Sequence, residues 1–107
     1  MPQSFDVQVA AGHDGSLVAR VSGELDLTAR TALVDAVTEP LGDGGAVKRL
    51  ALDLERVTFC DSSGLGALLD IRRASNEAGV DMVLRNVPLP VARLLDLTDV
   101  DGWLRRE

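Results

Sequence analysis

Two adjacent serines, Ser62 and Ser63, lie where the sequence changes from an apolar run to a helical pattern. A hydroxyl at the start of a helix lies near unpaired backbone amides and the positive end of the helix dipole, an environment that accommodates an added phosphate. Ser62 and the preceding Asp61 are also residue types that commonly cap a helix. Local chemistry therefore leaves two interpretations open, a phosphoacceptor and a simple helix cap.

Two carboxylates, Glu24 and Asp26, lie two residues apart in a second segment between a predicted strand and a predicted helix. If this segment meets the loop that contains Ser62, the carboxylates flank the hydroxyl, where their role would be to orient it or to help a visiting metal nucleotide. The alternative is an ordinary solvated turn, because acidic side chains mostly face water. The sequence gives no distance that decides between these alternatives.

Other kinds of active site are disfavoured. His13 is the single histidine and falls in a predicted turn, so a Ser-His-Asp triad would have to cross the domain. A phosphotransfer receiver with Asp61 as acceptor is a further alternative, but the single lysine, Lys48, precedes the buried strand, and no acidic pair ends the first strand to hold magnesium. Cys60 is interpreted as a small buried residue rather than a reactive thiol. No metal or cofactor site is predicted.

Composition sets the outer limits. The 107 residues suffice for one domain, and 46% of them are hydrophobic, as in an ordinary globular protein. The formal charge of −6 disfavours nucleic acid and anionic lipid surfaces as partners. One cysteine permits no internal disulfide, and neither a signal peptide nor a membrane-spanning run is recognised, so a cytoplasmic location is expected.

The first half of the sequence predicts a hairpin followed by a helix. Residues 5–9 and 17–21 alternate between apolar and polar around a turn rich in glycine. Thr28 is expected to cap a helix that runs to about Glu39, and Pro40 ends it.

The second half predicts further alternation of strands and helices. The nearly continuous apolar run 50–54 is typical of a central strand buried on both faces. A helix follows Asp61 and ends at Gly79, residues 80–84 form another strand, and a short helix and a terminal strand complete the chain. This order indicates an α/β fold with right-handed crossovers.

The sequence resembles the anti-sigma factor antagonist family, whose fold is the STAS domain. The resemblance rests on Gly-Glu-Leu-Asp at 23–26, Leu-Asp-Leu at 52–54, Phe-Cys-Asp-Ser-Ser-Gly-Leu-Gly at 59–66 and Leu-Leu-Asp-Leu-Thr at 94–98. It implies one STAS domain over residues 1–107, with an opening hairpin and a four- to five-stranded mixed β-sheet whose helices pack mainly on one face. Family members usually continue into a further C-terminal helix, which this chain is expected to lack.

The resemblance implies a regulatory binding module and not an enzyme. In the family, an anti-sigma factor that is also an ATP-dependent serine kinase phosphorylates the first serine of the pair, which here is Ser62. The unmodified protein binds the anti-sigma factor and releases a sigma factor in sporulation or stress responses, and a PP2C-type phosphatase restores it. The resemblance implies that the residues supporting the phosphosite are Asp26, Asp61, Ser63 and Gly64. It also implies that the partner binds at Glu24, Asp26, Leu27, Thr28, Ser62, Ser63, Gly64, Leu65 and Gly66. Leu27 and Leu65 are the expected apolar contacts.

Two alternatives stay open beside this switch. One is a STAS scaffold subunit of a signalling or lipid-transport complex, in which Ser62 is only a helix cap. The other is a receiver or enzyme that uses Asp61. Phosphate labelling of the purified protein separates the three, because the label would lie on Ser62, on neither residue, or on Asp61.

Overall fold

A computed structural model describes residues 5–42, 44–98 and 103–107 of the chain. A strand hairpin opens it, and strands alternate with helices afterwards. In order, the elements are β1 (Asp6–Ala11), β2 (Ser16–Leu25), α1 (Leu27–Thr38), the 3-10 helix η1 (Glu39–Gly42), β3 (Arg49–Cys60), α2 (Ser62–Ala78), β4 (Asp81–Arg85) and α3 (Leu89–Thr98).

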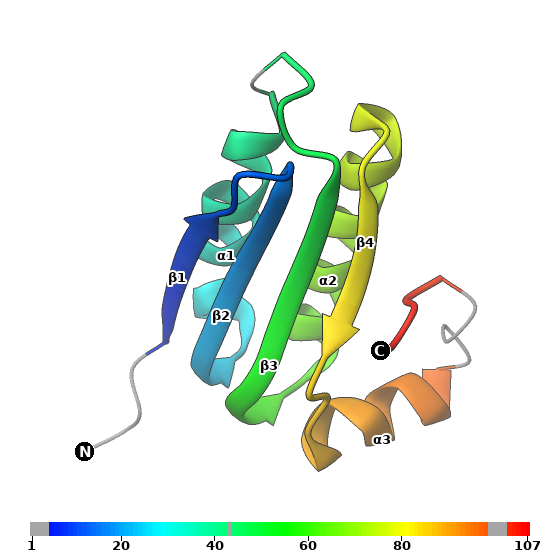
Figure 1. Cartoon of the computed structure of the whole chain (residues 1–107). Coiled ribbons are helices and arrows are strands. Elements are labelled where there is room, and N and C mark those ends of the chain that lie inside the picture. Colours follow the sequence, from blue (N-terminus) through cyan, green and yellow to red (C-terminus); the bar gives the residue numbers. More distant parts are fainter. Residues whose placement is uncertain (1–4, 43, 99–102) are drawn as a thin grey trace.

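The strands form one mixed sheet in the order β1-β2-β3-β4. β1 is antiparallel to β2, whereas β2, β3 and β4 are parallel to one another. Helices α1 and α2 cover one face of the sheet, and α3 lies beyond the end of β4 (Figure 1). The predicted mixed α/β sheet with an opening hairpin is therefore confirmed, with four strands. Of the expected terminal strand, the described residues show an isolated bridge between Leu84 and Arg106, and Gly102 lies outside them.

The parallel strands β2, β3 and β4 all end at the same edge of the sheet, the lower edge in Figure 1. Helices α1, α2 and α3 each begin shortly after one of these strands ends. Loops at the carboxyl ends of parallel strands commonly present functional groups in such sheets. Both segments singled out in the sequence therefore lie along one edge.

The core lies between the sheet and the helices. Alternate residues of β2 face it, as the apolar periodicity of residues 17–21 predicted, and Leu50, Leu52 and Leu54 of β3 face it too. Its fully buried large side chains are Leu25, Leu33, Leu50, Leu52, Leu54, Leu68, Ile71, Leu84, Leu95, Leu104, Val21 and Val37.

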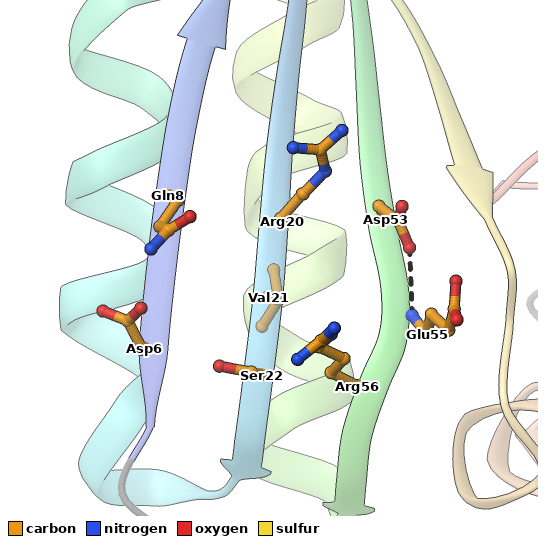
Figure 2. Close-up of a pocket in the computed structure, with 8 residues that line it drawn as sticks. All are labelled: Asp6, Gln8, Arg20, Val21, Ser22, Asp53, Glu55 and Arg56. Atoms are coloured by element: carbon orange, nitrogen blue, oxygen red, sulfur yellow. Dashed lines mark hydrogen bonds between the residues drawn. The ribbon is translucent and has the colours of Figure 1, made fainter.

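The expectation that the run 50–54 is buried on both faces holds for Ala51, which is 6% exposed, but not for Asp53, which is half-buried. Helices cover one face of the sheet, and the polar residues of β3, among them Asp53 and Arg56, line a depression on the other (Figure 2). β3 also extends well past Leu54, to Cys60. Its register against β2 shifts twice, between Arg20 and Ser22 and between Gly23 and Glu24. Such bulges add a residue to one strand and change which side chains face inward.

Candidate functional site

The junction between β3 and α2 is built around the carboxylate of Asp61. This residue is the N-cap of α2, and its Oδ1 accepts hydrogen bonds from the backbone amides of Ser63 at 2.9 Å and Gly64 at 3.1 Å. Ser62 is the first residue of the helix and its side chain is exposed. Within the described part of the chain, the hydroxyl of Ser62 has no hydrogen-bond partner. Asp61 therefore caps the helix, and Ser62 does not.

Gly64 allows α2 to begin in contact with the end of β2. A Cβ at this position would lie 2.3 Å from the carbonyl oxygen of Leu25 and 2.8 Å from the Sγ of Cys60. The same Leu25 carbonyl accepts a hydrogen bond from the amide of Asp61 at 3.4 Å. The two segments singled out in the sequence are thus joined through Leu25, and any side chain at position 64 would push them apart.

The junction between β2 and α1 has its own capping carboxylate. Asp26 is the N-cap of α1, and its Oδ1 accepts a hydrogen bond from the amide of Ala29 at 3.1 Å. Thr28 was expected to cap this helix, but it is an exposed residue of the first turn. Asp26 takes the cap because its backbone is extended, as an N-cap residue requires, whereas Thr28 is already helical. Asp26 thus contributes a helix cap, and its position beside Ser62 as phosphosite support stays a prediction.

The other predicted partner-binding residues differ in exposure. Leu27 is 71% exposed at the start of α1, whereas Leu65 is 6% exposed and belongs to the core. Leu65 therefore has little side-chain surface to offer a partner, because it is packed in the core. Glu24 and Gly66 are half-buried.

Two exposed apolar side chains at this edge were not singled out from the sequence. Phe59, next to the end of β3, is 46% exposed, and Leu89, the first residue of α3, is 61% exposed. An apolar residue in a strand or helix is ordinarily expected to be buried, so the sequence carried no signal for either. We call the set Leu27, Phe59, Ser62 and Leu89 the docking edge, since all four belong to ends of elements that meet at the lower edge in Figure 1.

Cys60 is buried at the end of β3, beside the capping residue. Burial raises the pKa of its thiol to about 11, and the negative charge of Asp61 adds to this effect. Its Sγ contacts the carbonyl oxygen of Asp61 at 3.6 Å. The thiol therefore stays protonated at neutral pH, which confirms its interpretation as a buried small residue rather than a reactive one.

The uncovered face of the sheet holds a shallow depression of about 600 Å³. Figure 2 shows Arg20 and Arg56 beside acidic residues of β1 and β3, with Asp53 accepting a hydrogen bond from the amide of Glu55. Charges of both signs line it, and no residue of the two capped junctions does. Among residues 5–42, 44–98 and 103–107, no three His, Cys, Asp or Glu side chains form a group able to hold a metal ion.

Comparison with known proteins agrees with this architecture. Residues 7–106 match the STAS domain family. An anti-sigma F factor antagonist from Paenibacillus polymyxa is 35% identical over 86 residues, which cover 80% of this chain and 73% of that protein. The crystal structure of an anti-sigma factor antagonist from Mycobacterium paratuberculosis has a TM-score of 0.79 and 28% identity, and the match covers 99% of this chain and 87% of that one.

A second solved structure shows the same fold. The anti-sigma factor antagonist SpoIIAA in its unphosphorylated form has a TM-score of 0.79 at 24% identity, with 95% of this chain and 88% of that chain covered. This chain belongs to the STAS domain family. That membership confirms the prediction of a binding protein rather than an enzyme. In the described part of the chain, no helix combines the length and apolar character needed to cross a bilayer.

Proposed function

We propose that this protein is a cytoplasmic anti-sigma factor antagonist that is switched by phosphorylation of Ser62. In its unphosphorylated form it binds an anti-sigma factor that is also a serine kinase, and a sigma factor is released. A PP2C-type phosphatase reverses the modification. The names of the relatives from Paenibacillus and Mycobacterium support the general role.

The observation that carries the proposal is the free hydroxyl of Ser62. It is exposed on the first residue of α2, while the carboxylate of Asp61 occupies the amides of Ser63 and Gly64. Because Asp61 holds the helix end, a phosphate added to Ser62 leaves the cap intact. Modification would therefore change the surface without unfolding the helix.

The docking edge supports a switch that works by charge. Leu27, Phe59 and Leu89 expose apolar surface that a partner would bury, and such burial favours binding. Phosphate on Ser62 adds about −1.5 to −2 charge next to Asp61, in a chain whose net charge is already −6. A partner that buries this edge would have to desolvate the new charge, so the phosphorylated form binds more weakly.

Kinase labelling tests the proposal. We expect incubation with a kinase-type anti-sigma factor and ATP to place an acid-stable phosphate on Ser62, located by mass spectrometry. Ser62→Ala should bind the anti-sigma factor and accept no phosphate, and Ser62→Asp should bind about 100-fold more weakly, a difference of about 2.7 kcal/mol. Ser63→Ala is the matched control, because it removes the neighbouring hydroxyl, and it should still be labelled.

Two results would contradict the proposal. An acid-labile phosphate on Asp61 would indicate a receiver, although the hydrogen bonds of Asp61 to two amides argue against that role. Absence of any label, together with equal affinity of the wild type and Ser62→Asp by calorimetry, would indicate a scaffold subunit that does not switch.

A further inference from the structure

Arg30 joins the two helices that begin at the docking edge. Its Nη2 on α1 lies 2.9 Å from Oδ2 of Asp70 on α2, and both side chains are partly exposed. The other oxygen of the same carboxylate, Oδ1, lies 3.4 Å from Nη1 of Arg73. Asp70 therefore has two cationic partners, and it keeps one of them if Arg30 moves away.

The guanidinium of Arg30 lies directly against Gly66. A Cβ on Gly66 would lie 2.7 Å from Nη1 and 2.9 Å from Cζ of Arg30. Ser62 is four residues before Gly66 in α2, so the two positions lie on the same face of the helix with their Cβ atoms about 6 Å apart. The guanidinium is therefore within about 9 Å of the Cβ of Ser62, a gap that a phosphate group and a rotation of the arginine side chain can close.

Two amides at the start of α2 are already occupied, and the flanking sequence segments contain no other cationic side chain. The amides of Ser63 and Gly64 donate to Asp61, so the start of α2 does not offer them to a phosphate. Arg30 is the only Lys or Arg in the sequence ranges 21–47 and 57–71, which contain α1, both capped junctions and the first turns of α2. The remaining charged groups of these junctions, Glu24, Asp26 and Asp61, are acidic.

We infer that Arg30 is the residue that binds the phosphate on Ser62, exchanging its ion pair with Asp70 for one with the phosphoserine. This inference rests on the proposed phosphorylation of Ser62. A phosphate competes well for the guanidinium, because it carries more charge than a carboxylate and presents three acceptor oxygens in a geometry that arginine binds in bidentate fashion. Asp70 stays paired with Arg73, so its carboxylate is not left without a cation. The modified state thus ties α1 to the start of α2.

The test titrates a phosphate that is installed without a kinase. Phosphoserine is encoded at position 62 during translation of the full chain, and its second pKa is measured by phosphorus NMR. A bound guanidinium favours the dianion, so we expect this pKa to be higher by about half a unit or more in Arg30→Gln than in the unsubstituted chain. Asp70→Asn removes the competing carboxylate and should lower the same pKa.

Arg73→Gln is the matched control. It removes one positive charge from the other partner of Asp70, but the three atoms nearest to a Cβ on Gly66 all belong to Arg30, so the phosphoserine pKa should rise less than in Arg30→Gln. Circular dichroism shows whether each variant is folded. Equal pKa values in Arg30→Gln and Arg73→Gln would overturn the inference. Because no kinase takes part, this result is independent of kinase labelling, whose failure would instead contradict phosphorylation of Ser62.

Discussion

The β2–α1 and β3–α2 junctions use the same backbone device to present different side chains. β2 ends at Leu25 and β3 ends at Cys60, and these two residues are partners in the register of the two strands. An aspartate in extended conformation follows each of them. The backbone angles are nearly identical, with φ of −119° and −113° at the two aspartates and ψ of −170° at both. The first helical residue is then an exposed leucine, Leu27, at one junction and an exposed serine, Ser62, at the other.

At each junction, different residues cap the helix and face the solvent. At both junctions the aspartate holds the helix end, so the following residue is free to serve another purpose. The third helical residue also differs between the two junctions, in the space available for a side chain. Ala29 fits in the first junction, whereas Gly64 is required in the second because the Leu25 carbonyl occupies the space of a Cβ. The β3–α2 junction is therefore the more tightly packed of the two.

The largest expected effect comes from adding a methyl group at the second junction. Gly64→Ala should lower the free energy of unfolding by about 3 kcal/mol, because the Cβ would overlap backbone that cannot move without separating β2 from α2. Urea unfolding measures the change. Gly66→Ala is the control, since its Cβ meets the movable end of Arg30, and it should change stability by less than about 1 kcal/mol. Equal losses in both variants would show that close packing at Leu25 is not the cause.

The two caps should differ in strength. Asp61 accepts from two amides and Asp26 from one. We expect Asp61→Ala to cost about 2 kcal/mol of unfolding free energy and Asp26→Ala about 1 kcal/mol. Asparagine at either position retains a capping oxygen and should recover most of the loss. An equal or larger cost for Asp26→Ala in urea unfolding would contradict the ranking.

The first helical residues should matter for binding and not for folding. Leu27→Ala removes an exposed side chain, so the unfolding free energy should hardly change, while affinity for the anti-sigma factor should fall about 10-fold. Leu97→Ala is the control, because Leu97 is 82% exposed near the other end of α3. Calorimetry measures the affinity of both variants for the anti-sigma factor. An equal loss of affinity in both would show that Leu27 makes no specific contact with the partner.

The strand ends should differ in their response to pH. The pKa of Cys60 is raised to about 11, whereas its partner Leu25 does not titrate. Above about pH 9, the normal pKa of a thiol, the unfolded chain loses this proton before the folded one does, so the folded state should become less stable between about pH 9 and 11. Urea unfolding of the wild type and Cys60→Ala across this range isolates the effect as the difference between their pH profiles. The same pH dependence of the unfolding free energy in both proteins would mean that folding does not raise the pKa of the Cys60 thiol.

Much of the site could be predicted because its signals are local. Asp61, Ser62 and Gly64 are neighbours in the chain, and capping preferences act over three or four residues. Gly79, with φ of 71° as the left-handed C-cap of α2, was predicted for the same reason. The assignment of the first cap to Thr28 failed because threonine and aspartate are both good caps, and the backbone chose the aspartate.

Errors arose where exposure depends on packing between distant segments. Leu65 was expected at the surface but is buried, and Phe59 lies exposed beyond two shifts of register between β2 and β3. Each shift reverses the alternation of side chains, which no count along β3 alone reveals.

The sequence by itself determined the family, the alternation of strands and helices, and the chemical groups at the start of α2, because periodicity and capping are properties of short segments. Only the tertiary structure decided that Leu25 joins the two junctions and that Arg30 lies against Gly66 while paired with a residue 40 positions away. The first contact arises where β2 and β3 pair, and the second where α1 and α2 pack side by side on one sheet face. The crossovers that bring these elements together leave no mark in the local pattern.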